Sequence, residues 1–296
     1  HDPTTVSEAA RCWRNRDWIR EKRPFFHIVS LLDPHDIYFL DPDREDEITL
    51  PPWPNASDTL AGKPSSQRTK RRDWSEKRWQ YYRRFYGERV SRLDGHIGLL
   101  LDELLCSGFA PNTWVIFTSD HGDMAGEHGI PFKGPFMYEG VVRVPLIVCP
   151  PAVRFGGQDR RSVEIAEKFA PFTSDVLVSQ VDLVPTILEI AGIPVPGTLP
   201  GRSVFPVVAG TPYREREAVF AEWAPPAIRM VRTKEWKYTV DETGEEELYH
   251  LAADPAETSN LAGDPRYRGM KRQLIQMLSE HLRRIGDPLC PPRVDG

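Results

Sequence analysis

Residues 114–129 read WVIFTSDHGDMAGEHG, and residues 131–134 read PFKG. The stretch opens with an apolar run of four residues, and a polar, glycine-rich segment follows it directly. A short apolar run bounded by turn residues predicts a buried strand that opens into a loop. Because ligands of open α/β sheets bind just beyond the carboxyl ends of strands, we expect a functional site in this loop.

Asp120 and His121 are the first chemically distinctive residues after this predicted strand. A carboxylate beside an imidazole suits a divalent cation, and Lys133 adds a positive charge a few residues further on. A cation and a lysine together indicate chemistry on an anionic group such as sulfate or phosphate. Taken alone, Asp120 and His121 fit a strand-end turn with capping side chains better than a metal site. The density of acidic residues, histidines and glycines in the loop favours a site.

Apolar runs and helical periodicity alternate along the first two thirds of the chain. Expected strands cover residues 25–32, 114–119, 144–149 and 175–178, and expected helices cover residues 6–22, 73–106 and 183–191. Strands that alternate with helices predict an α/β fold in which helices flank a mostly parallel sheet. Residues 39–67 are rich in proline, aspartate and serine and are expected to form a long surface excursion.

The pattern changes near residues 205–215. Four short strand-like segments separated by turns follow, and then a helix with one apolar face over about residues 266–285. We therefore predict two domains. Residues 1–210 form the α/β core, and residues 211–296 form a small C-terminal subdomain of antiparallel sheet plus helix.

Composition excludes several classes of protein. The net charge is −5, which does not indicate a nucleic-acid partner. No run of 18 apolar residues occurs, so no transmembrane segment is expected. Four scattered cysteines indicate neither a disulfide framework nor a zinc site. The basic and aromatic residues at 68–85 fit a helix whose arginines face water better than a polyanion-binding surface.

Several motifs together resemble the sulfatases of the alkaline-phosphatase superfamily. The segments that carry the resemblance are the 118–129 stretch with KGP at 133–135, YEGVVRVPLIV at 138–148, PFFHIVSLLDPHDIY at 24–38, QVDLVPTIL at 180–188, and YHL at 249–251 through DPAE at 254–257 and NL at 260–261. They follow the family's order over nearly the whole chain. The resemblance implies an alkaline-phosphatase-like fold and a sulfuric ester hydrolase that uses a divalent cation.

The resemblance also implies roles for single residues. Asp120 and His121 correspond to metal ligands, and the family's cation is usually Ca²⁺. Many members carry Asn where this chain has His121, and imidazole leaves room for Mn²⁺ or Zn²⁺. His35 and Lys133 correspond to the catalytic histidine and lysine that contact the sulfate group. We expect Glu127 and His128 of the same loop to bind the substrate. For these two, a structural role stays open.

One departure from the family is large. Sulfatases carry a nucleophile motif, Cys or Ser followed by x-Pro-x-Arg, and this chain has none; Cys290-Pro-Pro-Arg293 is one residue short. The core is therefore expected to be incomplete at its N-terminal side, and the isolated chain is expected to be inactive. Two alternatives remain: a phosphodiester or phosphonate monoester hydrolase of the same superfamily, and a non-catalytic relative or truncated product that binds sulfated glycans. The expected partner is a small-molecule or carbohydrate sulfate ester, whereas compartment and oligomeric state are not assigned.

Overall fold

The computed structural model describes residues 2–14, 24–151 and 171–289. The chain forms two compact units, and each unit is assembled from three separate stretches of sequence. The first unit comprises residues 1–51, 75–118 and 145–171, and the second comprises residues 52–74, 119–144 and 172–296. The predicted domain boundary near residue 210 stays a prediction.

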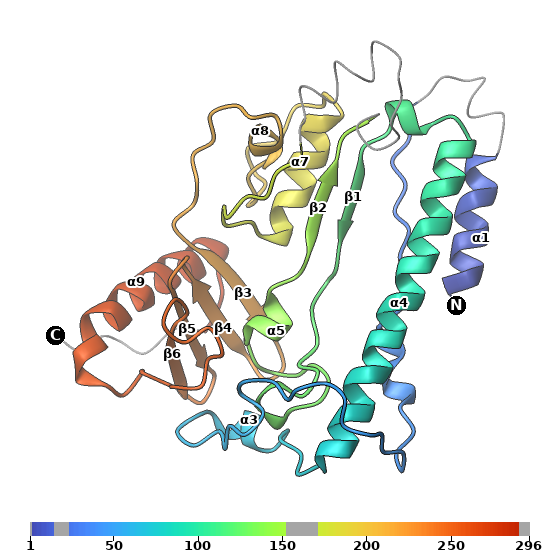
Figure 1. The fold of residues 1–296 in the computed structure, drawn as a ribbon. Coiled ribbons are helices and arrows are strands. Elements are labelled where there is room, and N and C mark those ends of the chain that lie inside the picture. The colour runs from blue at the N-terminus through green and yellow to red at the C-terminus, as the bar shows by residue number, and fades with distance from the viewer. Residues whose placement is uncertain (1, 15–23, 152–170, 290–296) are drawn as a thin grey trace. The chain divides into compact units, whose positions relative to one another are not determined.

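Two helices organise the first unit. α1 (Asp2–Trp13) runs beside the long helix α4 (Glu76–Cys106), as Figure 1 shows. α4 begins where the Ser75 side chain accepts the backbone N–H of Arg78, which caps the first turn. The core between the helices contains Val6, Ala9, Trp13, Leu100, Leu104 and Ala110. The predicted helix over 6–22 is confirmed up to Trp13, and residues 15–23 lie outside the described part of the chain.

Two short strands also belong to the first unit. β1 (Val115–Thr118) and β2 (Leu146–Cys149) pair in antiparallel register, with Val115 opposite Cys149. The turns η1 (His35–Phe39) and η2 (Ala110–Asn112) lie in connecting segments. Both strands were expected from their apolar runs, and β1 ends directly before the loop that carries Asp120.

Residues 25–32, predicted as a buried strand, form no strand in the structure. Their side chains alternate: Phe25 and Val29 pack against the core, whereas Phe26 and Ile28 are 67% and 73% exposed. A strand needs a neighbour that bonds its backbone N–H and C=O groups, and an apolar run does not reveal that neighbour. Among residues 2–14, 24–151 and 171–289, both sheets are antiparallel, so the mostly parallel sheet is not seen there.

The second unit contains a four-stranded antiparallel sheet covered by a helix. The strands are β3 (Val219–Trp223), β4 (Ile228–Arg232), β5 (Trp236–Asp241) and β6 (Glu246–His250), paired in sequence order. α9 (Arg268–Ile285) lies along this sheet, as Figure 1 shows. Leu274, Leu278 and Leu282 from α9 pack on Val231, Tyr238 and Leu248 of the sheet. The predicted antiparallel sheet and helix are confirmed.

Shorter elements also lie in the described part of the second unit. They are α3 (Ser65–Arg68), η3 (Glu127–Gly129), α5 (Glu139–Val142), η4 (Gln180–Asp182), α7 (Leu183–Ile190), α8 (Phe205–Val208) and η5 (Pro265–Tyr267). The strand predicted over 175–178 is wrong, because the backbone N–H of Leu177 bonds the Glu215 side chain instead of a neighbouring strand. No helix in the described residues is long and apolar enough to cross a bilayer.

Candidate active-site loop

The loop after β1 brings three predicted site residues together in the second unit. The Lys133 ammonium Nζ lies 2.6 Å from Nε2 of His121. The Asp120 carboxylate lies beside the same ring, with Oδ2 3.6 Å from Nε2. The structure thus brings Asp120, His121 and Lys133 together, although the last two are 12 positions apart in sequence.

The hydrogen bonds of His121 define which ring nitrogen can act as a ligand. Nδ1 lies 2.8 Å from the carbonyl oxygen of Gly122, which can only accept, so Nδ1 carries the proton. Nε2 then keeps its lone pair and accepts from Lys133. The bond from Nδ1–H to a carbonyl fixes the tautomer whose Nε2 can bind a metal ion, and Nε2 would do so once the Lys133 ammonium turned from it to an anion.

Asp120 offers the most accessible carboxylate of the loop. Its side chain is 85% exposed, and one oxygen accepts the backbone N–H of His121. Partial burial raises the pKa of Asp120, but the neighbouring His121 and Lys133 outweigh it and hold that pKa below its ordinary value. An exposed carboxylate beside the Nε2 of an imidazole fits part of the ligand set of a divalent cation.

Two further contacts fix the backbone of this loop. The Gln180 side-chain amide donates to the carbonyl oxygens of Ser119 and Asp120, at 2.7 and 2.8 Å. Gly122 packs so closely on α5 that a Cβ there would lie 2.1 Å from the carbonyl oxygen of Gly140. Only glycine fits at that approach. The carboxylate and the imidazole are therefore presented from a constrained backbone.

Glu127 and His128 lie at the tip of the loop, between His121 and Lys133 in sequence. The His128 side chain is fully buried, with Nδ1 2.7 Å from Oδ2 of Asp58 and the ring stacked on Tyr138. Glu127 is partly buried, and burial raises the pKa of its carboxyl group. In this arrangement His128 presents no atom to solvent, so the structural role that the sequence left open is the one its surroundings favour.

His35 belongs to the first unit, where it begins the turn η1. Its side chain is exposed, and its ring lies 5.0 Å from that of Tyr38, centroid to centroid. Asp33, which precedes it, is buried and bonded by Arg92 at 2.5 and 2.9 Å. The Asp33 carboxylate is thus bound to an arginine, and the His35 ring is open to solvent in the first unit.

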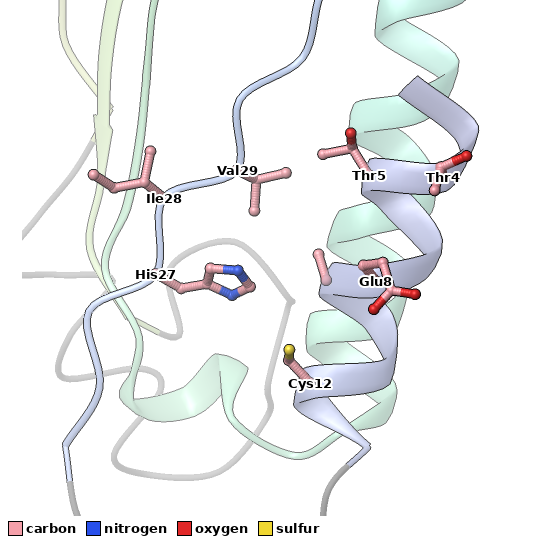
Figure 2. A pocket seen from close by; sticks show the side chains of 8 residues that line it. Thr4, Thr5, Glu8, Cys12, His27, Ile28 and Val29 are labelled. Atoms are coloured by element: carbon pink, nitrogen blue, oxygen red, sulfur yellow. The ribbon is translucent and has the colours of Figure 1, made fainter. Parts of the chain in front are cut away.

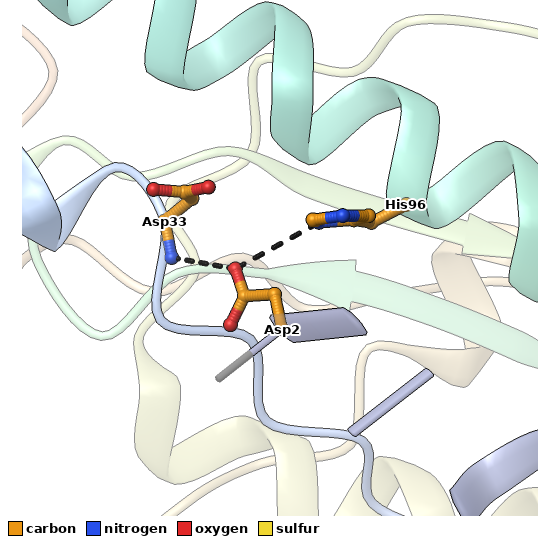
Figure 3. Close-up of side chains that lie close together, drawn as sticks. All are labelled: Asp2, Asp33 and His96. Atoms are coloured by element: carbon orange, nitrogen blue, oxygen red, sulfur yellow. Dashed lines mark hydrogen bonds and ion pairs between the residues drawn. The ribbon is translucent and has the colours of Figure 1, made fainter. Parts of the chain in front are cut away.

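A second cluster of acidic and imidazole groups lies in the first unit, where Figure 3 shows Asp2, Asp33 and His96 close together. Asp2 accepts the backbone N–H groups of Leu32 and Asp33 at 2.7 and 2.9 Å. Since Asp33 is also paired with Arg92, both carboxylates already have strong partners. The cluster ties the start of α1 to the chain before η1 and needs no metal ion.

A cavity of about 310 Å³ also lies in the first unit, between α1 and the segment 25–32. Figure 2 shows Cys12 and Glu8 on its helical side and His27 opposite. None of the residues predicted for the active site lines this cavity. The candidate site is therefore the loop after β1 and not this cavity.

Comparison with known proteins identifies the family. The sulfatase family model matches residues 4–193, and a model of the C-terminal part of N-sulphoglucosamine sulphohydrolase matches residues 126–284. By fold and motif, the chain is related to the α/β hydrolytic enzymes. It belongs to the sulfatase family. A choline-sulfatase from Rhizobium meliloti is 34% identical over 263 residues, which cover 83% of this chain and 48% of that protein.

Solved structures confirm the fold class. A candidate sulfatase from Bacteroides thetaiotaomicron superposes with a TM-score of 0.81 at 26% identity, over 97% of this chain and 64% of that one. A phosphonate monoester hydrolase from Agrobacterium radiobacter shares the fold, with a TM-score of 0.74 at 23% identity over 95% of this chain and 60% of that one. The predicted alkaline-phosphatase-like α/β class is thus confirmed. The chain spans about half the length of the curated relatives that it matches.

Sequence reasoning did not find the residues that support the loop. Gln180 stands just before the helix predicted over 183–191, and Asn55, Asp58 and Lys63 lie in the surface excursion predicted over 39–67. A long loop rich in polar residues is itself a signal of function. The particular partners could not be named, because they bond residues about 70 positions away in sequence.

Proposed function

We propose that this chain supplies one half of the active site of a sulfate-ester hydrolase. The observation that carries the proposal is the contact between Lys133 and His121 beside the exposed Asp120, in a chain of the sulfatase family. The ammonium group suits an anion such as sulfate, and the carboxylate–imidazole pair suits a divalent cation beside that anion.

Sulfatases use a divalent cation, and Asp120 and His121 are the residues of this loop that would hold it. When bound, the cation supplies positive charge next to the oxygens of the sulfate group. Carboxylate oxygen as a donor favours Ca²⁺, whereas the imidazole nitrogen of His121 also suits Mn²⁺ or Zn²⁺. We propose Ca²⁺ as the resident ion.

Lys133 and His35 take the catalytic roles in this proposal. Lys133 places a fixed positive charge against the ester oxygens, which stabilises the negative charge that develops as the bond to sulfur breaks. His35 donates a proton to the departing alcohol oxygen. Glu127 and His128 support the loop, and we assign the substrate contact to neither.

No Cys or Ser of the 296 residues stands in the x-Pro-x-Arg pattern, so we assign the role of nucleophile to no residue of this chain. The substrate class that we propose is a sulfate ester of a carbohydrate or of a small alcohol. Two matched names support this choice: a choline-sulfatase and the C-terminal model of N-sulphoglucosamine sulphohydrolase.

A substrate panel tests the proposal. Nitrophenyl sulfate, nitrophenyl phosphate and a nitrophenyl phosphonate are offered to a protein that joins this chain to a sulfatase nucleophile segment, and separately to the chain alone. We expect the joined protein to prefer the sulfate ester and the chain alone to give no turnover. Preference for the phosphonate would transfer the chain to the phosphonate monoester hydrolases. Retention on heparin without any turnover would favour the glycan-binding alternative.

A further inference from the structure

The active-site loop closes on itself between its two functional ends. The backbone N–H of Met124 donates to the carbonyl of Phe132 at 3.0 Å, and that of Gly126 donates to the carbonyl of Ile130 at 3.1 Å. Phe132 directly precedes Lys133. The closure therefore returns the chain to His121, and the position of the Lys133 ammonium depends on the shape of the whole loop.

That shape requires backbone conformations that side chains disfavour. Three residues other than glycine have positive φ values in the loop: Ala125 at 49°, His128 at 54° and Phe132 at 63°. Residues with a Cβ rarely adopt this left-handed region, and they persist there when the surrounding structure fixes them. Such a loop needs an anchor outside its own backbone.

His128 is the side chain that reaches such an anchor. It is fully buried, and its Nδ1 donates to Oδ2 of Asp58 at 2.7 Å. Its Nε2 accepts from the Asn55 side-chain amide at 3.1 Å, and its ring stacks on Tyr138 with centroids 4.1 Å apart. Both ring nitrogens and one ring face are thus engaged by residues of the same unit.

Asp58 is itself held in place by a second buried charge. Nζ of Lys63, a side chain with no exposed surface, lies 2.6 Å from Oδ2 of Asp58 and 2.6 Å from the carbonyl oxygen of Glu257. The Asn55 amide also lies 3.1 Å from the carbonyl oxygen of Ala256. The anchor is therefore part of a buried network that joins residues 55–63 to residues 256–257.

We propose that His128, held by Asp58, is a positioning residue that fixes the Lys133–His121 pair at the other end of the loop. This role rests on the proposed function of that pair. His128 touches neither the substrate nor the cation; it acts by holding the strained tip of the loop against the buried network. The loss of this anchor frees the loop and shifts the Lys133 ammonium from its place beside His121 and Asp120.

Hydrogen exchange of the isolated chain tests the anchor directly. In His128→Ala we expect the amides of Met124 and Gly126 to exchange about tenfold faster or more, because the bonds that close the loop open more often. His128→Asn should recover part of the protection, since Asn tolerates positive φ and keeps a side-chain donor. Asp58→Asn, which keeps the size of the side chain, should show a smaller acceleration and serves if the alanine variant does not fold.

His281→Ala is the matched control, because His281 stacks on Phe220 at 3.9 Å on α9. It should leave exchange of the loop amides unchanged. In the joined protein, His128→Ala should lower kcat for nitrophenyl sulfate about tenfold or more, with partial rescue in His128→Asn. Asp120→Ala serves as the independent check of the proposed function.

The outcomes separate the two ideas. Unchanged loop exchange in both His128→Ala and Asp58→Asn overturns the positioning role, whatever Asp120→Ala does. A loosened loop with unchanged kcat, while Asp120→Ala abolishes turnover, also overturns it. A loosened loop with a turnover that Asp120→Ala does not affect leaves the anchor in place but contradicts the proposed function.

Discussion

Lys133 Nζ lies 2.6 Å from Nε2 of His121, so a cationic side chain closes onto the ring nitrogen that keeps its lone pair. The two residues are brought together by the closed loop between them and not by neighbouring positions in sequence. This contact makes the loop after β1 the centre of the proposed sulfate site, and it leads to the first prediction.

Replacement of Lys133 should remove most of the activity of a complete enzyme that contains this chain. We expect Lys133→Ala to lower kcat for nitrophenyl sulfate about 10²- to 10³-fold, because the charge that stabilises the ester oxygens is lost. Lys133→Arg should retain an intermediate rate, since it keeps the charge but changes its geometry. Lys70→Ala, on an exposed lysine of the same unit, is the control. Equal rates for Lys133→Ala and Lys70→Ala would refute the assignment.

The burial of His128 should make the protein sensitive to acid. Burial, and then the charge of Lys63, lower the pKa of His128 from 6.5 to about 4, although Asp58 opposes this shift. Between these pH values the unfolded chain binds a proton that the folded chain does not. Stability present above about pH 6.5 is therefore lost as the pH falls toward 4, by about 3 kcal/mol.

Urea unfolding between pH 7 and pH 4 measures this effect. The variant His128→Asn cannot titrate in this range, so the part of the pH dependence that His128 causes should disappear from its unfolding free energy. Asp58, Lys63 and Asp254 are the charged groups that act on the ring, and all three remain in the variant. An identical slope in wild type and variant would contradict the prediction.

A buried ion pair network should stabilise the second unit strongly. The Lys237 ammonium is fully buried, 2.6 Å from Oε1 of Glu139 and 2.8 Å from Oε1 of Glu257. Lys237→Met leaves the buried Glu257 carboxylate without its cation, whereas Glu139 keeps Arg232 at 3.0 Å, and we expect a loss of about 3–5 kcal/mol in the free energy of unfolding. Lys234→Met, which removes an exposed pair with Asp175 and Glu215, should change stability little. Equal urea unfolding midpoints for Lys237→Met and Lys234→Met would contradict this expectation.

The sequence Asn55-Ala56-Ser57 is a glycosylation sequon that the fold should exclude. Asn55 is 3% exposed, and its amide lies within 3.2 Å of acceptors on Glu127, His128 and Ala256. We expect the folded protein from a glycosylating host to carry no sugar at Asn55. Intact mass before and after glycosidase treatment measures this, and Ser57→Ala should have the mass of the unmodified chain. A soluble, glycosylated fraction would show that Asn55 is accessible.

The sequence predicts best those elements whose partners are close along the chain. β3 to β6 each pair with the next segment, and α9 shows its apolar face through three- and four-residue spacing. The structure of residues 25–32 could not be predicted, because an apolar run does not indicate which segment hydrogen-bonds to its backbone. Their alternating exposure became visible only when the packing of α1 against them was known.

The sequence likewise predicts some residues of the candidate site and not others. Asp120, His121 and Lys133 could be named because their chemistry is concentrated in one short loop, and the structure brings them together. The role of His128 could not be read, since burial depends on Asp58, 70 residues away in sequence. A histidine in a polar loop looks exposed until its distant partners are known.

Metal dependence of sulfate-ester hydrolysis tests the central claim most directly. The protein that joins this chain to a nucleophile segment is stripped with chelator, and the rate of nitrophenyl sulfate hydrolysis is followed as Ca²⁺ is restored, in wild type and in Asp120→Ala. Our account predicts that Ca²⁺ restores the wild-type rate and that Asp120→Ala remains inactive or needs far more Ca²⁺. A chelator-resistant rate, or an Asp120→Ala variant that responds to Ca²⁺ as wild type does, would contradict it.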